Sequence, residues 1–335
     1  MNRVTSPLIK DPAFYPGQWG IQGSDSALGI RLSSLGTVYY VHALNPTAND
    51  DNMGTDPNFP MSTILAAYNR CVSGQNDVVV VVGQATQYGQ DATLVWAKNY
   101  THLVGVSADL HGVGQRVRIV GLNTADITPV LTVNADGCLF QNLQFYNGHD
   151  LAAASGAVVV TGGRNKFENC MFAGMAAAGP ANDAASYSLF VSGSENEFER
   201  CSIGLQTIIR TAANAELILS GAACYRNKFT KCEFLSWSVT AGKLLVNFAA
   251  NAVPWTTVFE DCYFGNLNMT AGGAAGAAIN DAFGNASAAF HQVMLTGRTT
   301  IVGCTGVGNA GALGVIWSSE GAPVNTFGLS LNPAA

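Results

Sequence analysis

Short apolar stretches alternate with polar turns along most of the chain, and in its second half they follow one repeated order. A six-residue pattern begins with an apolar residue, usually Phe, and has Cys at its fourth position in most copies. Four copies are plain, a weaker one precedes them and a degenerate one follows. The six copies span 140–145, 167–172, 198–203, 229–234, 259–264 and 301–306. Their fourth positions are 27 to 42 residues apart, so the variable spacing falls in turns and the pattern itself in the core.

A second apolar stretch lies upstream of each copy. These stretches span 130–133, 158–161, 189–192, 217–220, 244–247 and 293–296. Two or three short strands in a unit of about 30 residues are typical of a solenoid whose strands pair with the units above and below. We therefore predict an all-β fold, a single-stranded right-handed parallel β-helix of about seven to nine coils.

The repeated positions are expected to stack in columns along the solenoid, because parallel strands lie about 4.8 Å apart. Stacked Phe rings and small apolar Cys side chains suit the interior. Asn two residues before Phe suits a turn, where it satisfies backbone groups and tolerates left-handed geometry. The predicted columns are Phe167, Phe198, Phe229 and Phe259; Cys170, Cys201, Cys232 and Cys262; and Asn165, Asn196 and Asn227.

Charged residues fill the slot just after each Asn of the predicted column. Lys166, Glu197 and Lys228 occupy it on three successive coils, so opposite charges should face each other on the outer wall. Such exposed pairs stabilise the register by at most about 1 kcal/mol each.

The N-terminal part has a different order of motifs. A YYV stretch at 39–41 is followed by a polar loop, by a segment at 60–68 that predicts a short helix, and by an apolar strand at 78–82. Ser62 is expected to cap the helix, whose apolar face would carry Ile64, Leu65, Tyr68 and Cys71.

This order over residues 37–106 resembles the opening of pectate-lyase-like right-handed parallel β-helix proteins of the kind found among phage virion proteins, including decoration proteins and tailspikes. In that family a YYV strand, a loop of Gly, Asp and Asn, a P-x-x-T-I-x-x-A helix and a strand ending in G-x-Y cap the first coil. The resemblance implies a fold more than an activity, since the superfamily holds lyases, hydrolases, adhesins and inert capsid proteins.

The chain is thus expected to have four parts. Residues 1–36 are an extended N-terminal arm, and residues 37–106 are the N-terminal cap and first coils. Residues 107–306 hold the β-helix repeats with an insertion at 266–290, rich in small residues, and residues 307–335 form a C-terminal cap. In that cap Trp317 and Phe327 are expected to cover the open end of the core.

Composition narrows the classes of function. A net charge of −6, a pI near 5.3 and the lack of a basic stripe argue against a nucleic-acid partner. An apolar run of about 18 residues and a secretory signal are both missing, so we expect no membrane partner and synthesis in a host cytoplasm. The eight cysteines are then expected to be reduced thiols. No cofactor is expected.

Few residues suggest catalysis. Glu168, Glu199 and Glu260 share one slot after the repeated Phe and would be the catalytic carboxylates if the protein were an enzyme. Flanking Lys and Arg residues favour a solvated wall instead. Asp50, Asp51 and Asp56 could hold a cation, but the spacing of a calcium loop is missing, and no metal site is predicted.

The resemblance and the composition together favour a non-enzymatic virion protein, a homotrimeric capsid decoration or cement protein or a short spike of a phage. Its arm would contact other virion proteins of the capsid or tail. A tailspike or tail fibre that binds or cuts host surface polysaccharide is the nearest alternative. A cellular polysaccharide lyase or hydrolase, or an exported adhesin, comes next.

Overall fold

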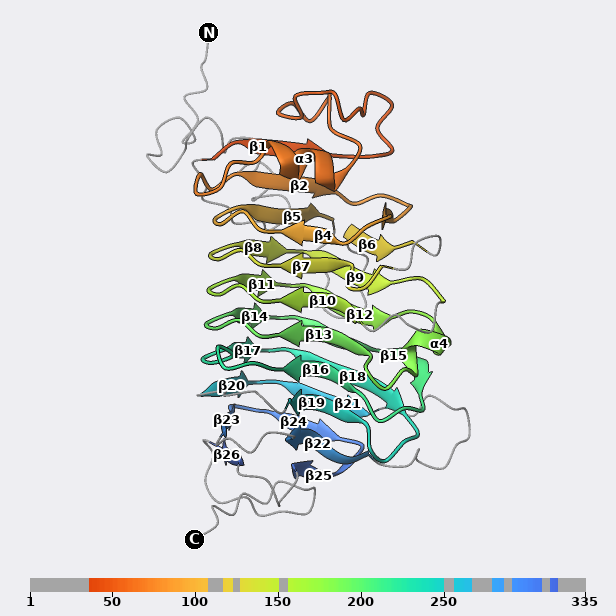
Figure 1. Ribbon diagram of the computed structural model, residues 1–335, viewed down its shortest axis with the longest axis vertical. Coiled ribbons are helices and arrows are strands. Elements are labelled where there is room, and N and C mark those ends of the chain that lie inside the picture. The colour runs from red at the N-terminus through yellow and green to blue at the C-terminus, as the bar shows by residue number, and fades with distance from the viewer. Residues whose placement is uncertain are drawn as a thin grey trace, which may run out of the picture.

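The computed structural model describes residues 36–107, 117–122, 127–150, 156–249, 256–266, 279–285, 291–308 and 314–318. Within them, short strands succeed one another in stacked coils, with β1 and β26 at opposite ends of the stack (Figure 1). Every strand pairs in parallel with strands of the neighbouring coils, as in β11, which lies between β8 and β14. The predicted right-handed parallel β-helix is confirmed.

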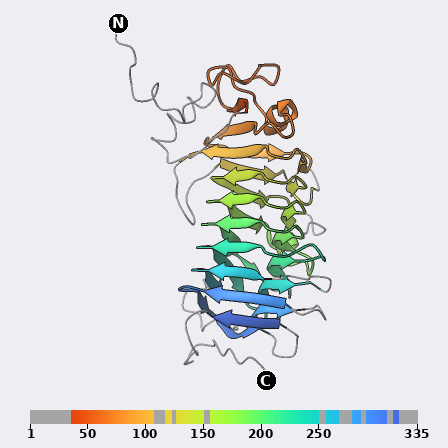
Figure 2. The same ribbon diagram turned by 90° about the vertical axis from the view of Figure 1, so that its left-hand side faces the viewer.

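The strands form three sheets, one along each side of the coils. Sheet A contains β1 (Val38–Val41), β2 (Val78–Val82), β5 (His102–Val106), β8 (Leu139–Gln141), β11 (Lys166–Glu168), β14 (Glu197–Glu199), β17 (Lys228–Thr230), β20 (Thr257–Glu260), β23 (His291–Thr296) and β26 (Gly314–Ser318). Figure 2 shows these strands stacked one below another.

Sheets B and C complete the coils. Sheet B contains β3 (Tyr88–Gln90), β6 (Val117–Gly121), β9 (Leu143–Asn147), β12 (Met171–Met175), β15 (Ser202–Arg210), β18 (Glu233–Ser238), β21 (Tyr263–Asn266) and β24 (Thr300–Val302). Sheet C contains β4 (Leu94–Trp96), β7 (Leu131–Val133), β10 (Gly156–Val160), β13 (Tyr187–Val191), β16 (Ala215–Leu219), β19 (Leu244–Phe248), β22 (Ile279–Asn285) and β25 (Cys304–Gly308). Among the described strands, eight coils thus pass through all three sheets.

Two short helices are described, α3 (Ile64–Arg70) and α4 (Ala178–Ala181). Neither approaches the length or apolarity needed to cross a bilayer. Helix α3 closes the N-terminal end of the core, where the Tyr68 ring lies 4.3 Å from the ring of Trp96. Its N-cap is Thr63, whose hydroxyl accepts from the Ala66 N–H, so the expectation of Ser62 was wrong by one residue. Leu65 is 50% exposed and not on the buried face.

The repeated Phe residues stack inside sheet A at the spacing of the strands. Ring centroids are 4.8 Å apart between Phe167 and Phe198, 4.6 Å between Phe198 and Phe229, and 4.9 Å between Phe229 and Phe259. Phe140 of the weaker copy extends the stack, 4.7 Å from Phe167. The rings are completely buried, so the column forms the centre of the hydrophobic core.

The repeated cysteines lie buried beside this column. Each thiol donates to the backbone carbonyl of the Phe one coil earlier, as Cys201 Sγ does to the oxygen of Phe167 at 3.3 Å and Cys232 Sγ to that of Phe198 at 3.3 Å. Cys170 and Cys262 make the same contact with Phe140 and Phe229. The cysteines therefore link coils by hydrogen bonds as well as by packing.

Asn165, Asn196 and Asn227 also link successive coils. The side-chain oxygen of Asn196 accepts from the backbone N–H of Asn165, and that of Asn227 accepts from the N–H of Asn196, both at 3.0 Å. The left-handed conformation expected for these Asn residues instead belongs to the preceding residue, for example Glu195 with φ of 60°. The Asn side chains thus serve the turn by bridging coils.

The last copy of the repeat is in a different register from the one the sequence suggests. Ile301 pairs with Phe264 in sheet B, whereas Leu295 of β23 pairs with Phe259 and continues the Phe column. The stretch 293–296 accordingly lies in sheet A, unlike the other five upstream stretches. The alignment of Ile301 with the repeated Phe was wrong. In this coil the residue in the Phe column is Leu295, and the longer spacing before it made the substitution hard to recognise in the sequence.

Parts of the predicted insertion and caps lie outside the described residues. Within 266–290, β22 is the sheet C strand of its coil, paired with β19 and β25. Within 307–335, β26 adds a further strand to sheet A and contains Trp317. Phe327 and the arm before Gly36 lie outside the described residues.

Candidate functional site: a charged wall and a buried ionic cluster

The candidate catalytic carboxylates share one row on the outer face of sheet A. Glu168 of β11 pairs with Glu199 of β14, and Thr230 of β17 separates Glu199 from Glu260 of β20. Their alternation with the buried Phe residues turns these side chains outward. The structure therefore brings Glu168 and Glu199 onto adjacent coils and leaves Glu260 two coils away from Glu199.

Each of these carboxylates is bound by a cation from another coil. Arg200 Nη2 donates to Glu168 Oε1 at 2.6 Å, and Lys166 Nζ donates to Glu199 Oε2 at 2.6 Å. Lys228 Nζ lies 2.7 Å from Glu260 Oε2. The pairs run diagonally, since Lys166 lies 3.9 Å from Glu197 directly opposite it but much closer to Glu199. The predicted facing of opposite charges is thus present, with the tight contact shifted by two residues.

These ion pairs set the proton affinities of the wall. The hydrogen bond from Lys166 holds the pKa of Glu199 below its ordinary value, against the effect of partial burial. The hydrogen bond to Glu260 raises the pKa of Lys228. A general acid for glycoside hydrolysis needs a carboxyl group with a raised pKa. Glu199 is shifted the other way, which suits a structural ion pair.

The acidic loop near the N-terminal end is built around backbone contacts. Asp50 Oδ1 accepts from the N–H groups of Ser62 and Thr63 at 2.8 Å each, and Asp50 Oδ2 accepts from the Thr63 hydroxyl. Asp56 accepts from the backbone N–H of Asn58. Asp50 therefore fixes the start of α3. No group of three or more His, Cys, Asp or Glu side chains among the described residues is arranged to hold a metal ion.

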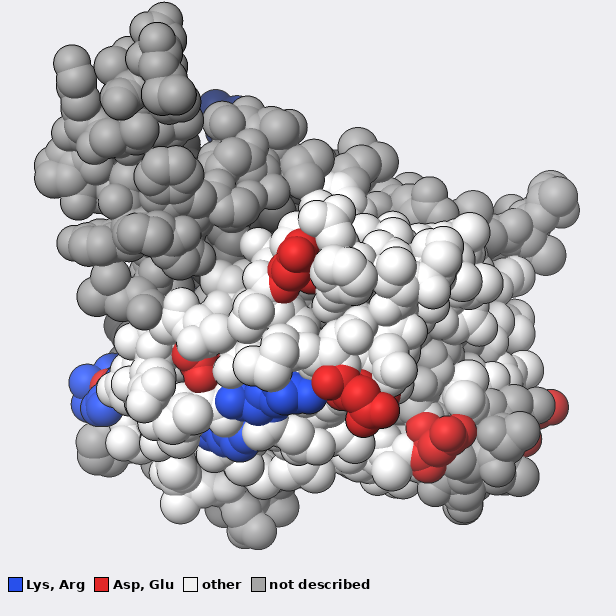
Figure 3. All heavy atoms as spheres, turned by 90° about the horizontal axis from the view of Figure 1, so that it is seen from above, with Lys and Arg blue, Asp and Glu red and all other residues white. Residues whose placement is uncertain are grey.

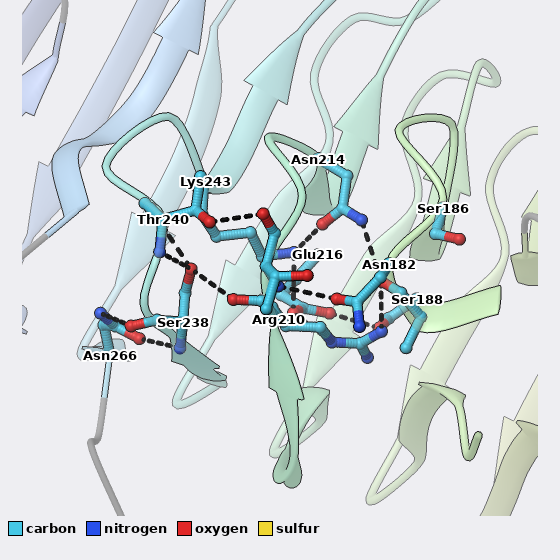
Figure 4. Close-up of polar contacts among 12 residues, drawn as sticks. Asn182, Ser186, Ser188, Arg210, Asn214, Glu216, Ser238, Thr240, Lys243 and Asn266 are labelled. Atoms are coloured by element: carbon cyan, nitrogen blue, oxygen red, sulfur yellow. Dashed lines mark hydrogen bonds and ion pairs between the residues drawn. The ribbon is translucent and has the colours of Figure 1, made fainter. Parts of the chain in front are cut away.

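The most unusual polar feature is a buried cluster at the corner between sheets B and C (Figure 4). Arg210 ends β15, Glu216 lies near the start of β16, and Lys243 directly precedes β19. Glu216 Oε1 is 3.0 Å from Lys243 Nζ and 3.7 Å from Arg210 Nε, and all three side chains are at most 2% exposed. We call these three residues the buried ionic cluster.

Each member of the buried ionic cluster also hydrogen-bonds to a neutral partner. Ser188 donates to Glu216 Oε2 at 2.6 Å, and Lys243 Nζ donates to Asn214 Oδ1 at 2.6 Å. Arg210 Nη1 donates to the carbonyl of Ala181 in α4 at 3.1 Å. The cluster therefore ties α4 and three successive coils together, and Figure 4 shows these side chains converging from neighbouring strands.

Two glycines make room for the cluster. Gly204 in β15 has φ of +95°, and a Cβ there would come within 2.0 Å of the Leu235 carbonyl oxygen and 3.0 Å of Glu216 Cδ. Gly174 has φ of +74°, and a Cβ there would lie 2.3 Å from Ser188 Oγ. A register shift between Leu205 and Ile209 then carries the end of β15 over the corner, where Arg210 covers Glu216. Only glycine fits these bulged, left-handed positions.

The cluster holds two cations and one anion away from solvent. Burial lowers the pKa of Lys243 to about 8, helped by the charge of Arg210 and opposed by Glu216. Although burial favours the neutral acid, Lys243 and Arg210 hold the pKa of Glu216 below its ordinary value. Glu216 therefore stays ionised at neutral pH and balances one of the two cations.

The sequence reasoning missed this cluster, since its members are far apart in the chain and belong to no repeated slot. One signal was present: Glu216 and Lys243 each stand at the start of an apolar strand, in a chain with only 11% charged residues. A charged residue in such a place has to be exposed at a strand end or paired in the interior. The sequence does not show where Arg210 lies in the fold, and without its position exposure of Glu216 and Lys243 cannot be distinguished from pairing in the interior.

Two uncharged surfaces contrast with the wall of sheet A. The outward positions of sheet C carry Val95, Thr132, Val159, Phe190, Ile218 and Asn247, which pair in register from coil to coil. At the N-terminal end, Leu44, Met53 and Phe59 are all more than half exposed. Seen from that end, the described surface is mostly uncharged, with isolated Asp, Glu, Lys and Arg side chains (Figure 3).

Comparison with known proteins identifies the class of fold. No protein-family model and no curated protein matches the chain. Among solved structures, pectate lyase Pel9A aligns with a TM-score of 0.54 and 16% identity, over 91% of this chain and 83% of that one. Pectin methylesterase from Aspergillus niger aligns with a TM-score of 0.52 and 16% identity, over 86% of each chain. The ORF18 structure of Geobacillus virus E2 aligns with a TM-score of 0.45 and 12% identity, over 95% of this chain and 63% of that one.

The two enzymes and this chain share the parallel β-helix fold. The class that the fold defines is thus the right-handed parallel β-helix. The fold alone assigns no activity, because function resides in particular side chains placed on it.

Proposed function

We propose that the chain is a non-enzymatic structural protein of a phage particle, a capsid decoration (cement) protein or short spike made in the host cytoplasm. The observation that carries the proposal is the pairing of the acidic row. Glu168, Glu199 and Glu260 are each held by a Lys or Arg of another coil, so they brace the wall. The Phe, Cys and Asn columns are likewise engaged from coil to coil.

The viral setting is supported by the N-terminal cap. The YYV strand, the polar loop, helix α3 and β2 lie in the order typical of phage virion proteins with this fold, and Asp50 joins the loop to the helix. We propose that residues of the arm contact other virion proteins of the capsid or tail.

We also propose that the protein is a homotrimer that associates through the outer face of sheet C. Six coils of this face carry no charged residue in the outward row, and Phe190 and Ile218 lie side by side at its centre. A second copy has the same rung spacing, so equivalent side chains of two parallel copies meet at every coil. The face measures on the order of 500 Å² per chain, or about 1,000 Å² for a pair, near the lower limit for a specific interface.

A purified virus preparation provides the direct test. We expect mass spectrometry to find the chain in purified particles in a fixed ratio to the major capsid protein. We also expect the recombinant protein to leave capsule, lipopolysaccharide and pectin unshortened, and a Glu168→Gln/Glu199→Gln variant to behave as the unmodified chain does. Absence from the particles would sink the proposal. Shortened glycan chains that the double variant no longer produces would favour the tailspike or polysaccharide-cleaving enzyme instead.

A further inference from the structure

The outer face of sheet A changes character along the solenoid. Its first coils carry a second apolar cluster, separate from the main core, which we call the outer patch. Residues Val79, Val81 and Leu103 of the same strands belong to the main core, so the alternate residues point outward. The outer patch consists of Val38, Val78, Val80 and Val104, with Tyr40, Val106 and Leu139 at its edge.

The outer patch ends where the charged wall begins. Leu139 of β8 pairs with Lys166 of β11, and the outward positions of β11 and β14 carry only Lys and Glu. One sheet thus presents an apolar surface over its first coils and a charged surface over the next ones. An apolar surface of this kind on the outside of a solenoid calls for a cover.

The outer patch is in fact shielded from solvent. Val78 and Val104 have no exposed surface, and Val80 is 4% exposed. On the charged part of the same wall, Lys166 and Lys228 keep 38% and 45% of their side-chain surface exposed. Burial lowers the pKa of His102, which lies in the outward row next to Val78, to about 4. Something beyond the coil itself therefore covers this face.

The chain before β1 has the length, the position and the pattern to be that cover. Thirty-five residues precede Gly36, which leads directly into β1 at the edge of the outer patch. They can extend to about 115 Å, whereas three strand spacings measure only about 14 Å. The last part of this segment alternates apolar residues at Leu28, Ile30 and Leu32, a period that presents one apolar side.

We propose that residues 28–32 lie as an extended segment over the outer patch of their own chain. The segment 108–116, which follows β5 on the same wall, is the rival cover. It offers only two large apolar side chains, Leu110 and Val113, without the alternation. Docking of residues 28–32 fixes where the arm starts on the rod and leaves residues 1–27 to reach elsewhere.

Hydrogen exchange on the full-length protein tests this inference. We expect the amides of residues 28–32 to be protected in the unmodified chain and to exchange about tenfold faster or more in Val104→Asp and in Ile30→Asp. Peptides from β14 and β17 should keep their protection in both variants. Val302→Asp, which changes a valine of sheet B that is 42% exposed, is the matched control and should leave residues 28–32 protected.

Three results would overturn the inference. The first is exchange of residues 28–32 at the rate of an unstructured peptide in the unmodified chain. The second is a Val104→Asp variant that releases residues 108–116 and leaves residues 28–32 protected. The third is loss of protection of residues 28–32 on dilution, which would assign the cover to another copy. If Val104→Asp does not fold, Ile30→Asp still tests the inference. Ile30 precedes the first strand of the solenoid, so its substitution leaves the coils themselves unchanged.

Discussion

His102 lies in the outward row of sheet A, but its side chain is largely shielded from solvent. Its backbone lies in β5 of sheet A, and its Nδ1 accepts from the backbone N–H of Leu139 at 3.0 Å. That contact requires the neutral ring, because a protonated imidazole has a hydrogen on both nitrogens. Burial acts in the same direction by lowering its pKa from 6.5 to about 4. His102 is therefore a neutral part of the wall over the physiological range of pH.

This property predicts a pH dependence of stability. The folded-state pKa is depressed, so the unfolded chain binds more protons between about pH 6.5 and pH 4, and stability falls as the pH falls through that window. We expect His102 to contribute a loss of about 2 kcal/mol between pH 7 and pH 5. Urea unfolding at the two pH values should show this loss in the unmodified chain and a smaller one in His102→Asn, whose side-chain oxygen can still accept from Leu139. Equal losses in both proteins would contradict the assignment.

At the scale of the element, β15 departs most from the regular coil. Glu216 is enclosed by three features of this strand, namely the glycine bulge, the register shift and Arg210 at the end of the strand. Removal of one member of a buried ion cluster leaves an unbalanced charge, whereas removal of all its charges together is often tolerated. The buried ionic cluster is therefore expected to respond very differently to single and to combined substitutions.

We expect Glu216→Gln to lower the free energy of unfolding by about 3–5 kcal/mol, because Arg210 and Lys243 then face each other without an anion. The matched control is Glu199→Gln on the outer wall, for which exposure limits the loss to about 1 kcal/mol. Chemical denaturation measures both. The triple variant Arg210→Met/Glu216→Leu/Lys243→Met should recover most of the loss. A Glu216→Gln variant as stable as Glu199→Gln would show that the cluster does not depend on its charge balance.

The elements also show how far the sequence could be interpreted. Phe167, Phe198 and Phe229 recur at nearly constant spacing, so their stacking and the coil register could be predicted. In the last copy Leu295 takes the place of Phe after a longer spacing. Ile301 resembles the first residue of the repeat in the sequence, but it lies in sheet B. The buried ionic cluster could not be predicted, because Arg210, Glu216 and Lys243 meet only through the bulge of β15.

The whole molecule is a rod with walls of different chemistry. Sheet A is apolar over its first coils and then charged, whereas the outward row of sheet C is uncharged from Val95 to Asn247. Such an asymmetric rod can associate along one side without burying its charges. The Phe190 rung lies in the middle of that side, where a charge would disturb contacts in both directions.

We therefore expect the unmodified protein to have the mass of three chains in light scattering, and Phe190→Asp to have the mass of one. A buried, unpaired carboxylate at the centre of an interface costs several kcal/mol, more than a contact of this size can offset. Val302→Asp, which changes an exposed residue of sheet B, should remain trimeric. A single-chain mass for the unmodified protein, or a trimeric Phe190→Asp, would contradict the role of sheet C.

The stack of Phe rings has a mechanical consequence. The centroids are 4.6 to 4.9 Å apart from Phe140 to Phe259, so the rings are already in contact along the axis. Force that pushes the two ends together meets a continuous column with no free space to close. Force that pulls them apart loads the hydrogen bonds between coils, which run along the same axis and can open at one junction at a time. The rod should therefore be stiff under compression and yield coil by coil under tension.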